Sequence, residues 1–578
     1  MVGRGRGDEM IARNLILGAL LLGAAVAGHA EPADLLLFNG QVLTVDKTFS
    51  IQKAIAVKDG RILAVGGDDI AQKYQAPVRI DLKGRTLLPG FMDNHLHPGM
   101  RSPRSVEVSD AKSIAEIQAR VRAKAKALGP GEWVTGYGWA ETNLAEKRNV
   151  VRADLDAAAP NNPVALSRAG GHSIVGNSLA LKAAGITRLT ENPLRGVIEH
   201  DAQGEPNGII RERIDLYNKL VPPDTQQALR PSLVASLKSL PTLGITSLII
   251  AAGSIGDEVK EELRPEQPPT QLTFKMLRSV YNEFGTDLPR ASLAVGYPGA
   301  KALAAYPHKT GYGDDRLRLG PIGEAPAVDG GFSGPTAWTT AEYKDTPGFH
   351  GQAFFNDEAD LQQLADDVAK NGWQLGLHAI GDRAINQAVK VYAQALRKYP
   401  RPDHRWYLAH FTMLPTNATL DTMAKEKIYA AAQPNFLYTL ESRYLQTLQG
   451  LDLQHNNPVA VPAKRGVFVT FGSDNLPIDP RVGLYAAVTR RGSSGVQFGR
   501  EEAVSIQDAI RMYTANPPYL TWEEGKKGTL EVGKLADMIV LDVDPLTTDP
   551  KRLLTMNVDL AIIGGKVVHD RAKAGAKR

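Results

Sequence analysis

Two histidines separated by one residue are the strongest local chemical signal in this sequence. They lie in the segment DNHLHP, directly after the apolar run Thr86–Met92. Side chains alternate along an extended chain, so His95 and His97 point to the same face and can hold one metal ion. Because a His-x-His pair also arises by chance on strands, the pair alone is weak support for a metal site.

Three more candidate ligands end apolar runs in the same way. His378 follows WQLGL, His410 follows WYLA and Asp474 follows VFVTFGS. In an α/β barrel the C-terminal strand ends meet at one rim, so residues far apart in sequence converge there. Singly, each could be a hydrogen-bonded turn residue, or for Asp474 a helix cap. Together the five residues indicate a metal centre, and His with carboxylate is a normal catalytic zinc ligand set.

The middle of the chain alternates apolar, β-branched runs with helical patterns, which is typical of βα units around a parallel sheet. We count eight candidate strands, the number that closes a TIM-like (β/α)8 barrel. Between them, Ala384–Leu396 has the apolar spacing of a connecting helix. The candidate strands are Leu87–His97, Ile245–Ala252, Phe274–Tyr281, Leu317–Glu324, Gln374–His378, Trp406–His410, Ile428–Gln433 and Val467–Asp474.

Both ends of the chain have a different pattern. Short apolar runs broken by Asn-Gly, Asp-Gly and Gly-Gly predict hairpins over 31–85 and again over 527–570. We expect the two parts to form one small β-sandwich around a barrel spanning 86–526. The gap at about 100–240 is too long for a βα connection and predicts an inserted region. Ser113 followed by Glu116 looks like a capping box that opens its first helix.

Composition excludes several classes of protein. The chain has no cysteine, so disulfides and thiolate metal sites are ruled out. The net charge is only +4, and the sequence lacks the dense Lys and Arg clusters of a nucleic-acid-binding protein. Residues 1–30 combine basic, apolar and small-residue segments, as a secretory signal does. The apolar stretch is shorter than a membrane span needs. We therefore expect an exported, periplasmic protein without stable membrane insertion after cleavage.

The motifs together resemble a known family. The HxH after the first strand, the later His, His and Asp residues, and the closing GTLEVGKLADMIVLD resemble the amidohydrolase superfamily. More narrowly, GGHSIVGNSLALKAAGI, HAIGDRAI, GSDNLP and TANPPYL resemble the branch that contains N-substituted formamide deformylase and related exported amidohydrolases. The resemblance runs from about Asp34 to Asp570. It implies a TIM-like barrel, a composite β-sandwich and a site for one or two divalent ions, usually zinc, with manganese as an alternative.

The resemblance also implies roles for individual residues. His95 and His97 would hold one ion, His378 and His410 a second, and Asp474 would be both a ligand and the general base. The bound ion would lower the pKa of its water toward about 7 and polarise a substrate carbonyl. Asp474 would take the proton of the attacking water and pass it to the leaving amine.

The sequence departs from the family at the fourth strand. Many relatives place a carboxylated lysine there to bridge two ions, but the run RLGPIGE contains no lysine. Glu324 is the nearest anionic oxygen donor, so it is a candidate bridging ligand; the alternative is a site with one metal. The following Asp329-Gly330 lies one residue further away than the usual spacing, which leaves the alignment open.

Substrate contacts are expected from the inserted region. His172 and Asn177 lie in the Gly-rich segment GGHSIVGN, which is either a substrate-facing loop or a turn with a structural histidine. Trp139, at the end of WVTGYGW, is a candidate pocket wall, although buried aromatic residues are more often core.

These observations predict a metal-dependent hydrolase that cleaves the carbon–nitrogen bond of a small non-peptide amide, formamide or cyclic amide. An ester or lactone hydrolase is the alternative, because the same chemistry attacks any carbonyl. A periplasmic binding or regulatory protein without turnover would be expected to have lost ligands, yet all five are present. The sequence leaves open the substrate, the number of metals and whether the chain forms a homo-oligomer.

Overall fold

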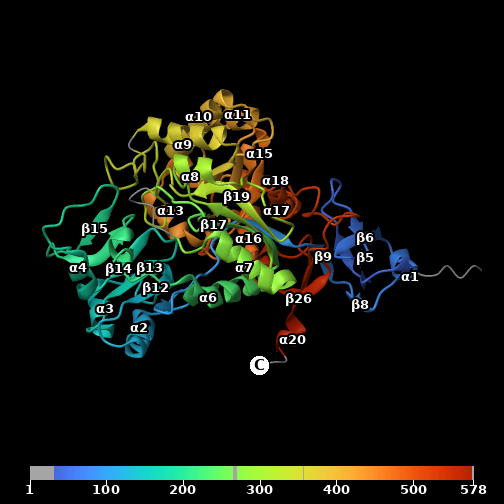
Figure 1. The fold of residues 1–578 in the computed structure, drawn as a ribbon, viewed down its shortest axis with the longest axis horizontal. Helices are drawn as coiled ribbons and strands as arrows, with labels where there is room; N and C mark the ends of the chain where they lie inside the picture. The colour runs from blue at the N-terminus through green and yellow to red at the C-terminus, as the bar shows by residue number, and fades with distance from the viewer. Residues whose placement is uncertain (1–30, 264–269, 356, 576–578) are drawn as a thin grey trace, which may run out of the picture.

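The computed structural model describes residues 31–263, 270–355 and 357–575, so the predicted signal segment at 1–30 lies outside the described residues. Figure 1 shows three regions side by side. A barrel occupies the centre, an inserted α/β region lies on one side of it, and a β-sandwich lies on the other. The N- and C-terminal parts of the chain meet in the sandwich.

The barrel contains eight parallel strands whose order in space follows the order in sequence. The first and last strands meet through a parallel bridge between Leu96 and Asp474, where the Asp474 amide donates to the His95 carbonyl at 2.7 Å. The predicted TIM-like barrel is therefore confirmed as a nearly closed barrel. Its strands are β10 (Phe91–Leu96), β17 (Ile245–Gly253), β18 (Arg290–Val295), β19 (Leu317–Glu324), β20 (Leu375–Ala379), β21 (Tyr407–His410), β22 (Tyr429–Ala432) and β23 (Val469–Phe471).

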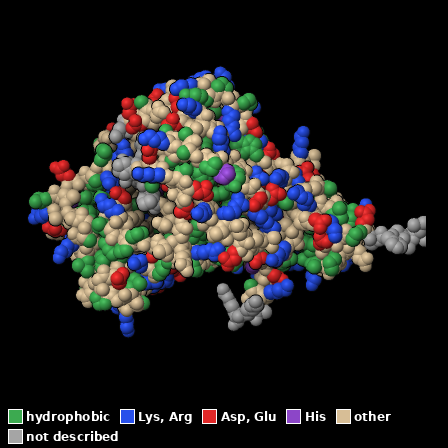
Figure 2. All heavy atoms as spheres, in the orientation of Figure 1, with side chains coloured by type: hydrophobic (Ala, Val, Ile, Leu, Met, Phe, Trp, Pro, Cys, Tyr) green, Lys and Arg blue, Asp and Glu red, His purple; other side chains and the backbone are tan. Residues whose placement is uncertain are grey.

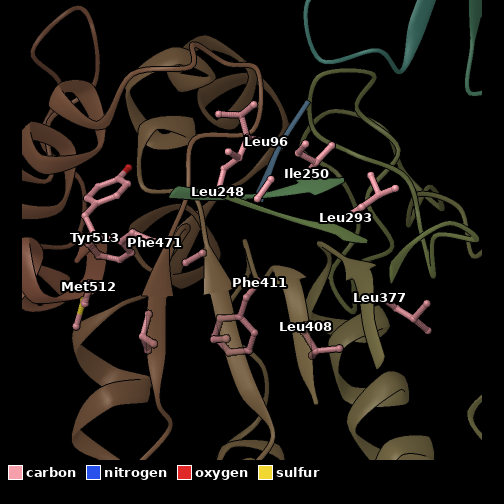
Figure 3. Close-up of a cluster of buried hydrophobic side chains, with 14 of the residues drawn as sticks. Leu96, Leu248, Ile250, Leu293, Leu377, Leu408, Phe411, Phe471, Met512 and Tyr513 are labelled. Atoms are coloured by element: carbon pink, nitrogen blue, oxygen red, sulfur yellow. The ribbon is translucent and has the colours of Figure 1, made fainter. Parts of the chain in front are cut away.

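Helices cover the outside of the barrel and bury apolar stripes against its strands. The helix expected at Ala384–Leu396 is α10 (Asp382–Lys398), in which Ile385, Val389 and Tyr392 are fully buried. Figure 3 shows Leu377 and Leu408 on neighbouring strands of this packed layer. Helix α17 (Ile506–Tyr513) also packs against a barrel strand, because its Tyr513 ring lies 5.3 Å from the ring of Phe471. The other barrel helices include α6 (Gln226–Ser239), α8 (Ala300–Ala305), α9 (Glu358–Lys370), α11 (Asn417–Glu426), α15 (Ala460–Lys464) and α16 (Pro480–Thr489).

The third strand is a correction to the sequence prediction. Phe274–Tyr281, expected to be a strand, belongs to helix α7 (Phe274–Phe284), and the strand is β18. Thr273 caps this helix by accepting a hydrogen bond from the Met276 amide at 3.1 Å. The buried Phe274, Leu277 and Tyr281 recur at helical spacing of three and four residues, which favours a helix over a strand.

The first predicted strand, Leu87–His97, is divided between two regions. β9 (Thr86–Pro89) pairs within the sandwich, whereas β10 begins the barrel. Gly90 separates them where the chain passes β17, and a Cβ atom at Gly90 would lie 2.1 Å from Thr246 Oγ1. Glycine is therefore required at this close approach.

The sandwich combines strands from both ends of the chain. One sheet has the order β6-β5-β2-β8 and the other β26-β25-β24-β9-β3-β4. Leu37, Val57, Met538 and Ile562 meet in its fully buried core. Its strands are β2 (Leu35–Phe38), β3 (Gln41–Leu43), β4 (Ile51–Gln52), β5 (Ala54–Lys58), β6 (Arg61–Gly66), β8 (Val78–Asp81), β24 (Met538–Leu541), β25 (Val558–Ile563) and β26 (Lys566–Asp570).

The inserted region has its own sheet, with the order β11-β12-β13-β14-β16-β15, and its own buried clusters. Its first helix, α2 (Ile114–Leu128), is capped as expected, because Ser113 Oγ accepts from the Glu116 amide at 3.2 Å. The remaining elements are β11 (Ser105–Glu107), β12 (Val134–Trp139), α3 (Arg152–Ala158), β13 (Val164–Arg168), β14 (Ser173–Gly176), α4 (Ser178–Ala184), β15 (Val197–His200) and β16 (Pro206–Arg211).

The outer surface is mixed in character. Lys and Arg side chains alternate with Asp and Glu over the face seen in Figure 2, which fits the small net charge. Across the described part of the chain, no helix has both the length and the apolar character that crossing a membrane would require.

Candidate metal centre

The six predicted ligands meet at the C-terminal rim of the barrel. Glu324, the last residue of β19, lies at the centre of the group. Its Oε2 is 3.4 Å from His95 Nε2 and 3.5 Å from His410 Nε2. Its Oε1 is 3.7 Å from His378 Nδ1 and 3.9 Å from His97 Nε2. The structure thus brings histidines from three strands, β10, β20 and β21, around the one carboxylate that ends β19.

Asp474 completes the cluster from the opposite side. Its Oδ1 lies 3.5 Å from His97 Nε2. The ligand atoms form three overlapping groups, each within 4.8 Å, and Glu324, His95 and His410 each belong to two of them. Of these three, only Glu324 has two oxygen atoms with which it could serve two ions. The groups are His95 with His97 and Glu324, Glu324 with His378 and His410, and His95 with His410 and Asp474.

Several polar atoms in this cluster are buried without a hydrogen-bond partner among the described residues. They are Nε2 of His95, His378 and His410, Oε2 of Glu324 and Oδ1 of Asp474. Each such atom costs about 1–3 kcal/mol if nothing binds it. Imidazole nitrogens and carboxylate oxygens gathered at one point are the donors that zinc prefers, so these residues fit a divalent ion.

The backbone at the rim is strained at three of the six positions. Glu324, His410 and Asp474 have φ values of 64°, 74° and 57°. A side chain other than glycine pays about 1–3 kcal/mol for this conformation, and such residues cluster at functional sites. Each of these residues lies at the end of its barrel strand or just beyond it, where the chain turns at the rim.

Electrostatics favour an anionic Glu324 with neutral His95 and His378, whereas at His410 burial is outweighed by Glu324, which raises the pKa. Burial would raise the pKa of Glu324, but His95 and hydrogen bonds from His378 and His410 outweigh it and hold the pKa well below its usual range. Burial lowers the pKa of His95, and burial with the nearby His410 lowers that of His378 to about 4. Neutral imidazole and ionised carboxylate are the forms that bind metal.

Asp474 is shifted in the opposite direction. Burial raises its pKa, with a further contribution from Glu324, against the opposing effect of His97 and His410. A carboxylate whose pKa is raised toward neutrality is better suited to accept and return a proton than an ordinary one.

Gln433 orients one of the histidines and was missed by sequence reasoning. Its Oε1 lies 2.9 Å from His410 Nδ1, while its Nε2 donates to the Ala431 carbonyl at 3.1 Å. The amide oxygen can only accept, so His410 Nδ1 carries a proton toward Gln433, and in the neutral ring Nε2 is the nitrogen left free to bind a metal ion. Gln433 ends the predicted seventh strand in the same way that His410 ends the sixth. This shared position at a strand end could have identified Gln433 as a site residue from the sequence.

Asp93 ties the two sides of the rim together. Its Oδ1 accepts from the His95 amide at 3.1 Å and from the Ser473 amide at 3.0 Å. Burial raises the pKa of Asp93 to about 7 despite these hydrogen bonds. The carboxyl group therefore fixes β10 against the segment that carries Asp474.

His172 reaches the rim from the inserted region. Its ring centre lies 5.7 Å from that of His378, and its Nδ1 lies 2.8 Å from Glu212 Oε2. Burial opposes the charged form of His172, but Glu212 outweighs it and raises the pKa to about 9. Glu212 also accepts from the Thr336 hydroxyl, which joins the inserted region to a barrel loop. Glu212 lies forty residues from His172, so no local motif revealed it.

The other two residues expected at the substrate lie elsewhere. Asn177 is fully buried, caps α4 through the Ala180 amide at 3.1 Å and also donates to the Asn162 carbonyl at 2.9 Å. Trp139 is 1% exposed, and its indole N–H donates to the Leu166 carbonyl at 3.3 Å. Both side chains therefore hold the inserted region together instead of lining the catalytic cavity.

A cavity of about 410 Å³ opens above the rim. Its polar floor includes His97, Glu324, His378 and Asp474, and His172 forms part of the wall. Much of the remaining wall is apolar, provided by Phe332, Phe354, Phe436, Leu440, Tyr444 and Leu476. A mainly apolar chamber with a few convergent polar groups is the usual form of a small-molecule site.

Comparisons with known proteins agree with this geometry. The sequence profile of the Amidohydrolase family matches residues 79–569. The chain is 27% identical to N-substituted formamide deformylase from Arthrobacter pascens, over 93% of this chain and 98% of the relative. An uncharacterised metal-dependent hydrolase from Pyrococcus horikoshii has the same fold, with a TM-score of 0.68 and 22% identity over 89% of this chain and 99% of that one.

A more distant structure with this fold contains the metal. Atrazine chlorohydrolase TrzN from Arthrobacter aurescens, solved in complex with zinc, has a TM-score of 0.50 and 13% identity, covering 93% of this chain and 95% of that one. The fold is therefore shared across distant relatives. The profile match spans the whole barrel, the inserted region and the C-terminal part of the sandwich, and the chain belongs to the amidohydrolase family.

Proposed function

We propose that this protein hydrolyses a carbon–nitrogen bond in a small non-peptide amide, formamide or cyclic amide, using one or two divalent ions at the barrel rim. The observation that carries the proposal is the buried Glu324-centred cluster, whose ligand atoms lack hydrogen-bond partners among the residues described. The similarity to a formamide deformylase and the zinc in the TrzN complex support it.

The ligand assignment follows the three overlapping groups. His95 and His97 would hold one ion and His378 and His410 a second, with Glu324 between them and Asp474 close to the first. Zinc is the metal proposed, with manganese as the alternative, because the donors are nitrogen and oxygen only. A bound divalent ion would supply activated water near neutral pH and polarise the substrate carbonyl.

The protein's own groups would move the proton and position the substrate. Asp474 Oδ1, in its ionised form, accepts the proton of the attacking water and returns it to the leaving nitrogen. His172 has Nδ1 engaged by Glu212, which leaves Nε2 as the ring nitrogen available to a substrate. The apolar wall excludes water and accommodates a hydrophobic part of the substrate.

Metal removal and a paired substrate panel test the proposal. Purified protein should contain zinc or manganese by elemental analysis, lose activity to a strong chelator and regain it when the ion is restored. N-formyl and N-acyl amines should be assayed beside esters of matched shape. Faster turnover of the amides is expected. Preference for the esters would favour ester or lactone hydrolysis, and metal-independent turnover would contradict the proposal.

We also propose that the protein is exported and that residues 1–30 are removed. The support is the order of basic, apolar and small-residue segments in the sequence. N-terminal sequencing of the protein from the envelope fraction of the native cell should begin near residue 31. An intact first residue in the cytoplasmic fraction would contradict export.

A further inference from the structure

We propose a second binding site, for a small monovalent anion of halide size, between the inserted region and the barrel. A small space of about 40 Å³ lies there, distinct from the larger cavity above the rim. Three guanidinium groups line it: Arg168 ends β13, Arg211 ends β16, and Arg443 lies on the barrel-side helix α13 (Glu441–Thr447). The site does not depend on the proposed hydrolase activity.

The three arginines have too few carboxylates nearby. Glu141 is shared, accepting from Arg168 Nε at 2.9 Å and pairing with Arg443 Nη2 at 2.7 Å. Arg211 has Glu199 at 3.4 Å. Glu212, the next residue along the chain, is already paired with His172. Three positive and two negative groups at the cavity leave one positive charge without a counter-charge.

The hydrogen-bonding groups at the cavity are also unsatisfied. Nε of Arg443 and Oγ of Ser333 are buried and have no hydrogen-bond partner within the described chain, and Nε of Arg211 makes no hydrogen bond there although it lies 3.4 Å from Glu199 Oε1. All three can donate a hydrogen bond. A single anion accepts from several donors at once and offsets the buried charge, whereas a water molecule would satisfy some donors but leave the charge. Burial and the nearby Arg168 lower the pKa of Arg443, as expected where like charges crowd.

The volume sets the size of the ligand. A cavity needs about 10–15 Å³ in this measure to hold one water, so 40 Å³ accepts a halide ion but not a molecule of the size that fills the catalytic cavity. Ser333 lines both cavities, so the anion would fix a part of the catalytic wall from behind. The anion would thereby join the inserted region to the barrel.

Bromide in crystals of the unmodified protein gives the direct test. Anomalous diffraction from crystals grown with bromide in place of chloride should show one peak at hydrogen-bonding distance from Arg211 Nε and Arg443 Nε. Density for water alone in that space, with no anomalous peak, would overturn the proposal.

Thermal unfolding tests the same site in solution. Sodium chloride should raise Tm by about 1–3 °C above sodium gluconate at equal ionic strength, and the increase should saturate because a specific site fills. Arg443→Met should remove this difference. Arg230→Met, which removes a surface pair between Arg230 on α6 and Glu283 on α7, should keep it. Equal Tm in the two salts, or a linear rise without saturation, would count against the site.

Discussion

Two buried charged clusters lie at opposite ends of the barrel and differ in how completely their atoms are bonded. At the N-terminal end, Arg290 begins β18 and pairs with Asp537 through bonds of 2.6 and 3.1 Å. Arg290 Nη1 also donates to the Asp315 carbonyl, and Asp537 Oδ1 accepts from the Gly564 amide. Every side-chain nitrogen and oxygen of this pair has a partner.

The rim cluster is also largely buried, although Glu324 and His97 are 20% and 31% exposed, but its atoms are not bonded in this way. The Nε2 atoms of His95 and His410 lie 3.4 and 3.5 Å from Glu324 Oε2, and none of these three atoms has a hydrogen bond of normal geometry in the described structure. The difference shows that burial of charge does not reveal its purpose. A cluster whose atoms are all paired supports the fold, whereas one whose atoms are held close but left unpaired is prepared for a ligand.

The largest expected effect is a loss of turnover on substitution of Asp474 at the rim. Asp474→Asn keeps the size of the side chain but removes its charge and its capacity to accept a proton. Turnover of metal-loaded protein should fall by roughly 10²–10⁴, the range for loss of a general base. Steady-state kinetics with metal content measured in parallel checks this. Near-normal turnover in a metal-replete Asp474→Asn protein would remove the role assigned to Asp474.

A substitution at the opposite end of the barrel should lower the stability of the fold and leave the metal site intact. Arg290→Met leaves Asp537 buried without its partner, which should lower the free energy of unfolding by about 3–5 kcal/mol. Chemical denaturation measures the loss. The metal content of the folded fraction should stay unchanged, and a loss of metal from this variant would break the distinction between the two clusters.

Glu324→Gln tests whether the rim carboxylate serves the metal. A neutral amide cannot offset the charge of two nearby cations, so metal affinity should fall by more than the 10–100-fold typical for a residue that only supports a ligand. The metal-free variant should be no less stable than metal-free wild type. Reconstitution of the wild type should not need bicarbonate, because a glutamate carboxylate forms without carbon dioxide. Full metal content in the variant would show that Glu324 is not a ligand.

The smallest expected effect is a loss of metal affinity on substitution of Gln433, which acts through His410. Gln433→Leu removes the acceptor for His410 Nδ1 and should weaken metal binding by about 10–100-fold. Gln374→Leu is the matched control. Gln374 is also a buried amide, but it donates to the Arg405 and Leu520 carbonyls below β20. Metal competition titrations should separate the two variants, and equal metal affinities would leave Gln433 without a positioning role.

The sequence predicted the barrel because strand ends carried both an apolar pattern and a chemical signal. Strands ending in His378, His410 and Glu324 were placed correctly. The third strand has no polar residue of that kind, and the neighbouring segment Phe274–Tyr281 has a stronger apolar pattern that belongs to a helix. Gly90 also divides one long apolar run between two regions, which only the close approach to Thr246 explains.

The contacts around the metal ligands could not be predicted from the sequence, because they join segments that are far apart in the chain. His172 and Glu212 meet because β14 and β16 pair, and nothing in either segment alone identifies the partner. Asn177 has a polar side chain in a Gly-rich segment, yet its hydrogen bonds to the backbone fix it as a helix cap. Sequence patterns therefore located the ligands, while the groups that orient them required the fold.

A crystal structure of zinc-loaded protein, with anomalous data collected at the zinc edge, tests the central claim most directly. The account predicts ions bound by His95, His97, His378 and His410, with carboxylate oxygens of Glu324 at about 2.0–2.2 Å from them. Ions held by other residues, with Glu324 turned toward solvent, would contradict it.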